Sequence, residues 1–320
     1  MIASRYASES VRKGVAFLVD MQSPDGFWRD YDLPPGTSED WTTAWIGWCL
    51  THAARHRGVA LSLGQAVRAI ISAHRSGGWG YNRRQTPDAD STSWCLRFLA
   101  AAGAVRYARA NGDLEAYLDT GGAAHTFLDA GAGSWGDAHP DVTPVVGLAL
   151  LVTVASPAQV FRVRQAVLDA RRSGGVWSSF WWNSDAYATA WSVEFLARSG
   201  TIPQGPALDV REWLPDVGSE CSAMALAHRL LVALAIGMEP LGEHTMTAVD
   251  ALLDLADGER GWPPSALLLV PPRSDGSTES IPHADVAGLM STATAVAALS
   301  RWIAAANGSY LPTDRAAFPH

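Results

Sequence analysis

The sequence predicts an all-α fold, a closed (α/α)6 barrel of six helical-hairpin repeats, from two observations. The first is a glycine-tryptophan turn that recurs at intervals of 51, 56, 42 and 85 residues, the last close to two periods, at Trp28, Trp79, Trp135, Trp177 and Trp262. The second is that an amphipathic segment precedes each turn and a more uniformly apolar segment follows it. One amphipathic and one apolar helix per repeat favour an outer ring of helices around a buried inner ring.

Each repeat pairs two helices of different character. The amphipathic members have apolar residues at helical spacing, as in VRKGVAFLVDMQ and AVRAIISAHR. The apolar members are TTAWIGWCL, STSWCLRFLAAAG, TPVVGLALLV, ATAWSVEFLARSG and STATAVAALSRW, and a sixth, within GSECSAMALAHRLLVALAIG, has no tryptophan turn before it. An open solenoid would need capping repeats with a polar face, which the sequence lacks, so we expect residues 1–320 to form a single closed barrel domain.

Composition and charge limit the classes of function. Of 320 residues, 48% are hydrophobic and 18% are charged, as is typical of a globular protein with a large core. The net charge of −8 argues against a nucleic-acid partner, because phosphate binding requires a basic face. Three cysteines are too few for a disulfide framework. The N-terminus lacks the apolar core of a signal peptide and no apolar run would span a bilayer, so we expect a cytoplasmic protein without a transmembrane segment.

Carboxylates gather where the apolar helices begin, which in a closed barrel is the rim of a central cavity. The repeats align on a Thr-x-Trp or Thr-x-Val sequence near the start of each apolar helix. Six residues before the last residue of that sequence lie Glu39, Asp88, His139 and Asp185. Four residues before it lie Trp41, Asp90, Asp141, Tyr187 and, in the fifth repeat, Glu220.

Asp90 differs from the other rim carboxylates. Acidic residues at the first of the two positions are typical of helix caps, which favour the ionised form and therefore lower the pKa. Asp90 is an additional carboxyl group beside Asp88, facing an expected aromatic cavity. Two adjacent carboxyl groups in a poorly solvated site do not both ionise readily, so one of them keeps its proton at neutral pH. This pattern predicts a proton donor.

Three segments in order resemble the class II terpene cyclases, the squalene–hopene cyclase group. PDADST, residues 87–92, resembles their Asp-x-Asp-Asp acid motif, and PDVT, residues 140–143, resembles a segment with a further aspartate followed by a histidine. GGVWSSFWWNSDAYATAW, residues 174–191, is similar to their next turn, and the repeated turns resemble their QW motifs. The resemblance implies that Asp90 is the general acid and Asp88 the first aspartate of the motif. It departs at Ser91, the third acidic position, and at Val145, the position of the histidine.

The resemblance also implies a chemistry and a set of site residues. Asp90 would protonate an alkene or epoxide of an isoprenoid substrate, hydrogen-bonded by Asp141, Ser91 or His139. Aromatic faces stabilise the resulting carbocation without reacting with it, and the expected rings are those of Trp41, Trp181, Trp182 and Tyr187.

The expected substrate contacts include charged residues as well. Arg83 and Arg84 precede the acid motif and could bind a diphosphate or lie in solvent, while His139 and Asp185 complete the expected substrate-binding set. No cofactor is required, and Mg²⁺ would enter only with a diphosphate substrate. A single barrel leaves room for a partner subunit or a homo-oligomer, because many members of the group carry a second helical domain.

Two other functions fit a barrel of this size. Six units in one chain also resemble the β subunit of protein prenyltransferases, which would need Asp, Cys and His converging on zinc, and Cys221 beside Glu220 is the candidate sulfur ligand. The third reading is a non-catalytic barrel that binds an apolar ligand or partner. We expect no metal site in the cyclase reading.

Overall fold

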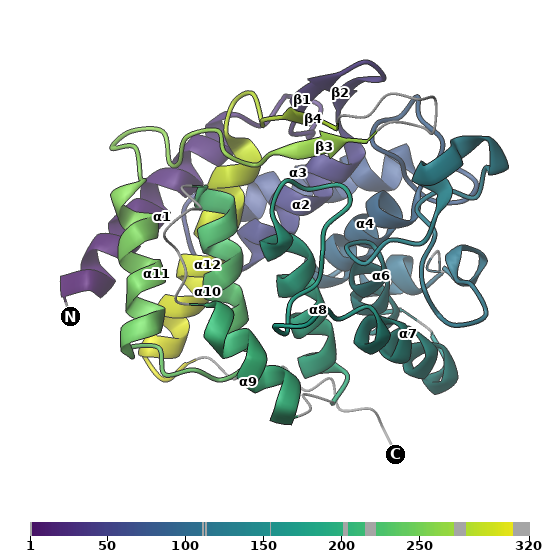
Figure 1. Ribbon diagram of the computed structural model, residues 1–320. Coiled ribbons are helices and arrows are strands. Elements are labelled where there is room, and N and C mark those ends of the chain that lie inside the picture. Colours follow the sequence, from purple (N-terminus) through teal and green to yellow (C-terminus); the bar gives the residue numbers. More distant parts are fainter. Residues whose placement is uncertain are drawn as a thin grey trace.

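An inner ring of helices closes on itself in the computed structural model, which describes residues 2–309 except 111, 113, 154, 201–203, 215–221 and 272–279. The ring consists of α2 (Asp40–Thr51), α4 (Ala89–Ala101), α6 (Thr143–Leu150), α8 (Asp185–Arg198), α10 (Ala223–Ala235) and α12 (Leu289–Ala306). Each helix packs on the next, and α12 packs on α2 (Figure 1). The predicted (α/α)6 barrel is therefore confirmed.

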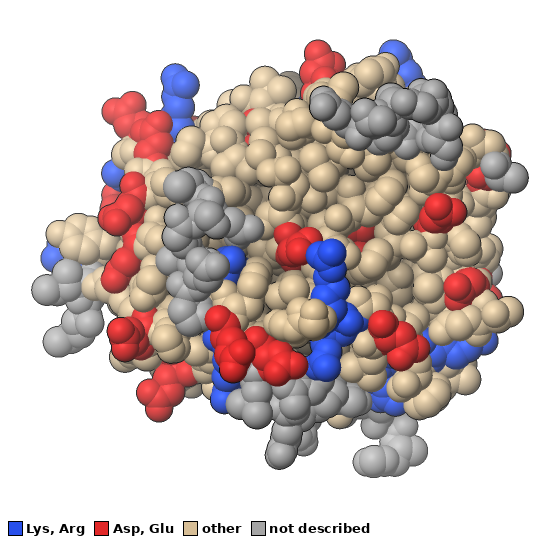
Figure 2. Space-filling view, in the orientation of Figure 1, with Lys and Arg blue, Asp and Glu red and all other residues tan. Residues whose placement is uncertain are grey.

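Outer helices cover the ring, one before each inner helix. They are α1 (Ile2–Asp20), α3 (Val59–Ala73), α5 (Val105–Ala110), α7 (Pro157–Asp169), α9 (Gln204–Trp213) and α11 (Glu243–Asp254). Acidic side chains project from the outer helices at the left of Figure 2, whereas uncharged residues dominate the upper part of that face. Helix α12 is long and apolar enough to cross a membrane by length and composition, but 72% of it is buried because it belongs to the inner ring.

Four of the turn tryptophans fasten an outer helix to the following inner helix in the same way. The indole N–H of Trp79 donates to the carbonyl of Ile70 near the end of α3, at 2.7 Å. Its backbone N–H donates to the hydroxyl of Thr92 in α4, at 3.1 Å. Trp28, Trp177 and Trp262 make the equivalent pairs of bonds, and all four side chains are buried. The glycine-tryptophan repeat therefore encodes a hydrogen-bonded joint.

Neighbouring inner helices approach closely through glycine. Phe98 of α4 lies against Gly47 of α2, and Phe195 of α8 lies against Gly147 of α6. A Cβ atom added at Gly147 would lie 2.7 Å from the Phe195 ring, well inside van der Waals contact. The ring closes at this spacing because these positions have no side chain.

Gly147→Ala is expected to lower the free energy of unfolding by about 1 to 3 kcal/mol, because overpacking outweighs the gain in helix propensity. Gly64→Ala in α3 is the matched control, since an added Cβ there has open space up to 3.7 Å from Arg68. That control should raise stability by up to about 1 kcal/mol. Urea denaturation of both variants measures the difference, and equal shifts of the two would contradict the packing argument.

Short β hairpins, which the sequence did not predict, lie at one end of the barrel (Figure 1). Strands β1 (Asp30–Leu33) and β2 (Gly36–Ser38) pair antiparallel with a bulge between Asp30 and Asp32. Strands β3 (Leu268–Val270) and β4 (Ile281–His283) pair antiparallel with Leu269 opposite Pro282. The backbone of Leu269 donates to Trp181 at 2.7 Å, which joins this second hairpin to the loop before α8.

Side chains along the barrel axis lie in layers, because three inner helices each point the residues at positions i, i+4 and i+7 inward. These stripes are Trp41, Trp45 and Trp48 on α2, Asp90, Trp94 and Arg97 on α4, and Tyr187, Trp191 and Glu194 on α8. In the middle layer the ring centroids of Trp45 and Trp94 are 4.2 Å apart, and those of Trp94 and Trp191 are 5.0 Å apart. This layer closes the barrel at mid-height, with a cavity on one side and buried charges on the other.

Candidate active site

The cavity lies at the end of the barrel that carries the hairpins and has a volume of about 600 Å³. Residues 33–35, 126–135 and 268–270 form its mouth and walls. Of the predicted site residues, it brings together Asp88, Asp90, Ser91, Trp41, Trp181 and Trp182. The hairpins thus extend the apolar wall above the inner ring.

Asp88 caps α4 and bonds to Ser91. Its Oδ1 accepts the backbone N–H of Ser91 at 2.7 Å, and its Oδ2 accepts the Ser91 hydroxyl at 2.7 Å. Burial raises the pKa of Asp88 to about 6 despite these bonds. Since the Ser91 hydroxyl donates to Asp88, it does not supply the hydrogen bond expected for Asp90.

Asp90 lies in the first turn of α4 and faces the cavity. Burial raises its pKa well above the usual value, and the neighbouring carboxyl groups of Asp88 and Asp141 raise it further. The hydroxyl of Tyr187 donates to Asp90 Oδ1 at 3.4 Å. At neutral pH the carboxyl group therefore keeps its proton, and its hydrogen-bond partner is Tyr187 from α8.

Asp141 fixes the loop that carries two aromatic residues of the cavity. Its Oδ2 accepts the backbone N–H groups of Phe180 and Trp181, both at 2.8 Å. Its Oδ1 is buried and has no hydrogen-bond partner among the described residues. Burial raises the pKa of Asp141 to about 6. Asp141 thus positions the loop and contributes a negative charge near Asp90 without bonding to it.

Stacked aromatic rings form one wall of the cavity. Trp182 stacks on Tyr187 with centroids 4.9 Å apart and contacts Trp41 at 5.8 Å. Tyr81 stacks on Trp41 at 6.3 Å, and the sequence reasoning missed it although it follows the second glycine-tryptophan turn by two residues. Phe127 also lines the cavity and was missed, because it lies in a loop without repeat symmetry.

Trp135 belongs to the glycine-tryptophan repeat of the sequence, but it does not join an outer helix to an inner helix as the other four tryptophans do. Its indole N–H donates to the Pro271 carbonyl at 2.7 Å, and its ring lines the cavity and contacts Trp181 at 5.6 Å. The true third turn is at Ala124, whose backbone N–H donates to the Thr143 hydroxyl at 3.0 Å. Residues 125–139 are therefore an insertion between turn and helix, and Trp135 is part of the cavity wall.

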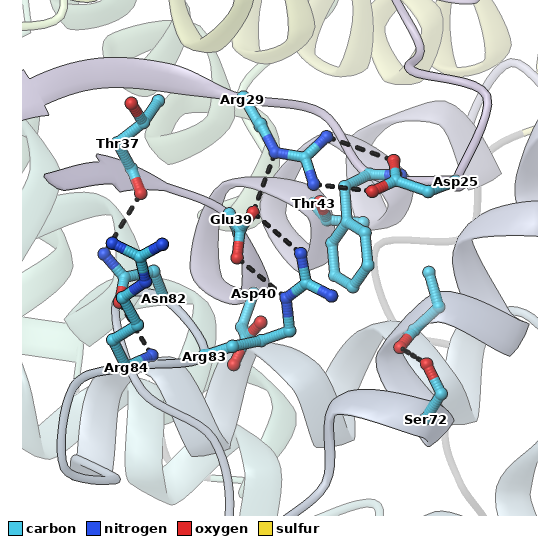
Figure 3. A network of polar contacts seen from close by, with 12 residues as sticks. Asp25, Arg29, Thr37, Glu39, Asp40, Thr43, Ser72, Asn82, Arg83 and Arg84 are labelled. Atoms are coloured by element: carbon cyan, nitrogen blue, oxygen red, sulfur yellow. Dashed lines mark hydrogen bonds and ion pairs between the residues drawn. The ribbon is translucent and has the colours of Figure 1, made fainter.

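Arg83 and Arg84 lie outside the cavity lining. The Arg83 guanidinium bonds to both carboxylate oxygens of Glu39, at 2.9 and 3.1 Å (Figure 3). Glu39 also accepts from Arg29 at 2.8 Å, and Arg29 pairs with Asp25. This surface network pairs Arg83 with Glu39, and the role of both arginines as diphosphate ligands stays a prediction.

His139 and Asp185 also lie away from the cavity lining. The His139 ring stacks on Phe180 with centroids 3.7 Å apart, and its Nε2 bonds to the Ser134 carbonyl at 2.9 Å. Asp185 accepts the backbone N–H of Ser179 at 3.0 Å. Both side chains hold loops, and neither bonds to Asp90.

The prenyltransferase reading requires Asp, Cys and His side chains that converge on zinc. Within the part of the chain that the structure describes, no three His, Cys, Asp or Glu side chains are grouped to hold a metal ion. Cys49 and Cys95 are buried and free. The candidate ligands Glu220 and Cys221 lie outside the described residues.

Comparison with known proteins agrees with the fold. No family model and no curated protein sequence matches the chain. A ligand-free variant of the type II terpene cyclase MstE from Scytonema superposes with a TM-score of 0.80 and 25% identity, over 95% of this chain and 98% of that one. A protein from Actinoplanes superposes with a TM-score of 0.78 and 27% identity, over 93% and 99%. ent-Copalyl diphosphate synthase from Streptomyces platensis, 16% identical, shares the fold alone, with a TM-score of 0.62 over 82% of this chain and 50% of that one.

By its fold, the chain is similar to the class II terpene cyclases. The similarity to MstE of that class extends over almost the whole length of both chains.

Proposed function

We propose that this protein is a class II terpene cyclase in which the carboxyl group of Asp90 protonates an isoprenoid substrate and starts its cyclisation. The observation that carries this function is a protonated Asp90 beside an apolar, ring-lined cavity. The expected compartment is the cytoplasm, and the single barrel of residues 1–320 acts as one catalytic domain.

The first step moves one proton. The O–H bond of Asp90 breaks, and the π electrons of the terminal alkene form a C–H bond with that proton. The neighbouring carbon becomes a carbocation, which the next alkene attacks to form a C–C bond. Loss of a proton from the last cation yields the cyclic product, so atoms and charge balance without a redox partner. Protonation chemistry of this kind requires no resident metal or cofactor, and Mg²⁺ would accompany only a diphosphate substrate.

The surrounding residues divide into two roles in this proposal. Trp41, Trp181 and Trp182 line the cavity, and Tyr187 stacks on Trp182; their ring faces stabilise the migrating charge, each by roughly 0.5 to 2 kcal/mol when desolvated. Asp88, Ser91 and Asp141 position the start of α4 and the loop before α8. The dry wall also protects the cation from water, which would otherwise end the reaction.

The substrate class follows from cavity size and from the structural neighbours. A volume of about 600 Å³ fits a drug-sized apolar ligand. Structures of MstE contain geranylgeranyl dihydroxybenzoate as substrate and merosterolic acid A as product. We therefore propose a polyprenyl chain, free or attached to a small aromatic group, as the substrate here.

Incubation in deuterium oxide tests this function. The purified chain is given geranylgeranyl dihydroxybenzoate, farnesyl and geranylgeranyl diphosphates, or squalene, and the products are analysed by mass spectrometry. A cyclic product with one deuterium at the initiation carbon supports protonation by an exchangeable acid. A cyclic product without deuterium would exclude it, and unchanged substrates throughout would favour the barrel that only binds an apolar ligand. Metal analysis of the same preparation tests the zinc-dependent prenyltransferase reading.

A further inference from the structure

The inward stripe of α4 places a cation two turns below the proposed acid. Asp90, Trp94 and Arg97 occupy positions i, i+4 and i+7, so they share one helix face. At about 1.5 Å per residue, the backbone positions of Asp90 and Arg97 are roughly 10 Å apart along the axis. Trp94 lies between Asp90 and Arg97 on this inward face of α4.

Arg97 is held by aromatic rings instead of by carboxylates. Its guanidinium carbon lies 4.0 Å from the ring centroid of Trp94, 4.7 Å from that of Trp191 and 4.9 Å from that of Trp48. Only 3% of the residue is exposed, and its Nη1 and Nη2 atoms have no hydrogen-bond partner among the described residues. A buried charge without hydrogen bonds is costly, so packing alone gives no reason for an arginine at this position.

The neighbouring carboxylate does not cancel this charge. Glu194 bonds to Arg301 at 2.9 Å and lies 3.9 Å from Arg198, so its charge is shared by two other arginines. Burial lowers the pKa of Arg97 to about 9, which still leaves it charged at neutral pH. The closed end of the barrel therefore directs a net positive field toward the cavity.

We propose that Arg97 is a positioning residue that stabilises the carboxylate formed when Asp90 gives up its proton. This inference rests on the proposed function and deepens it. At the roughly 10 Å that separates the two backbone positions, a unit charge in an effective dielectric constant of about 20 changes an ionisation equilibrium by roughly tenfold. Arg97 makes Asp90 a stronger acid while the dry cavity keeps Asp90 protonated before the reaction.

Other groups facing Asp90 act in the opposite direction. The carboxyl groups of Asp88 and Asp141 disfavour ionisation of Asp90, whereas the Trp41 side chain and, to a smaller extent, the charge of Arg97 favour it. Tyr187 of α8 is neutral, with a pKa raised by its burial, and Asp40 of α2 pairs with Arg75 at 3.5 Å. Arg75 is paired with Asp40, so the unpaired positive charge that acts on Asp90 is that of Arg97.

A chain of hydrogen bonds offers a second connection between Arg97 and the acid. The indole N–H of Trp94 donates to the Tyr187 hydroxyl at 3.3 Å, and that hydroxyl donates to Asp90 at 3.4 Å. A cation over the face of Trp94 polarises its N–H and strengthens the first donor. The variant Trp94→Phe keeps a ring under Arg97 and removes this donor, so it separates the two connections.

The test compares Arg97→Met, Arg97→Gln and Arg97→Lys by two measurements. In ligand-free protein carrying ¹³C-labelled aspartate, NMR titration should place the pKa of Asp90 about one unit higher in Arg97→Met and Arg97→Gln than in the wild type. With substrate, the alkaline limb of kcat/KM should move upward by the same amount while the plateau falls up to about tenfold. Arg97→Lys should restore both values, since it keeps the charge.

The outcomes separate the inference from the proposed function. An unchanged Asp90 titration in both neutral variants would overturn the role of Arg97, even if their activity fell. A shifted titration together with a wild-type protein that makes no cyclic product would leave the inference standing and overturn the cyclase function. Thermal unfolding checks the fold, and Arg97→Met should be as stable as the wild type or more so, because it removes a buried charge.

Discussion

Asp90→Asn is expected to reduce formation of the cyclic product by roughly three orders of magnitude or more, because an amide cannot donate a proton to an alkene. The substitution preserves shape, and the aspartate it replaces is already neutral in the folded protein. Substrate binding should therefore change little. Product formation measured by mass spectrometry over long incubations sets the lower limit of the residual rate.

Asp90→Asn should lower activity but raise the stability of the folded protein at pH 7. The pKa of Asp90 is higher in the folded than in the unfolded protein, so the contribution of Asp90 to stability is fully present below about pH 4 and is lost as the pH rises through its folded pKa. Asn at this position removes that loss, and Asp90→Asn should unfold at a higher temperature than the wild type at pH 7. Asp185→Asn is the matched control, since Asp185 lies outside the cavity lining, and it should keep activity within about twofold. An active Asp90→Asn enzyme would refute the role of Asp90 as acid.

Trp79→Ala is expected to lower the free energy of unfolding by about 3 to 5 kcal/mol. The side chain is fully buried, and its removal leaves a large cavity and an unpaired Ile70 carbonyl between α3 and α4. A loss of this size is a large part of the stability of an ordinary domain. Chemical denaturation measures this loss. The activity of the Trp79→Ala variant should decrease in parallel with its stability.

Trp135→Ala is the matched substitution in a similar sequence, GSWG instead of GGWG. Because Trp135 is half-buried and lines the cavity, its loss should cost under about 2 kcal/mol of stability. It should instead change KM or the product mixture, as the wall near Trp181 is altered. Equal stability losses for the two variants would contradict the distinction between joint and wall.

The architecture was predictable because its signal is repeated. The joint formed by Trp79 requires glycine, tryptophan and threonine at fixed places, and four of six repeats keep this chemistry. The third repeat has Ala124 at the joint and a tryptophan, Trp135, later in the chain. Matching the repeats by residue type alone therefore selected Trp135 in place of Ala124. The rim hairpins were missed for a related reason, since insertions in single repeats have no internal pattern to compare.

Asp90 could be identified from the sequence as the candidate acid, whereas its environment could not. Two carboxyl groups on one helix start, at Asp88 and Asp90, suffice to suggest a proton donor. The partner of Asp90 is Tyr187, ninety-seven positions away in the chain, and only the curvature of the ring brings them together. Arg97 could have been found from the sequence, because it follows Asp90 by seven residues and therefore lies on the same face of the helix. It was missed because an arginine in an apolar helix is ordinarily placed at the surface.

The tryptophan layer at mid-barrel closes one end of the cavity. A substrate would therefore enter and leave at the hairpin end, with its hydrocarbon tail entering first and its other end remaining near the hairpins. Asp90 lies one helical turn above Trp94 of this layer, where the tail of such a substrate would end. The enzyme would thus select its substrates by the hydrocarbon tail that reaches Asp90. Substrates with other head groups could be accommodated by changes in the loops at the mouth of the cavity, while the chemistry at Asp90 stays the same.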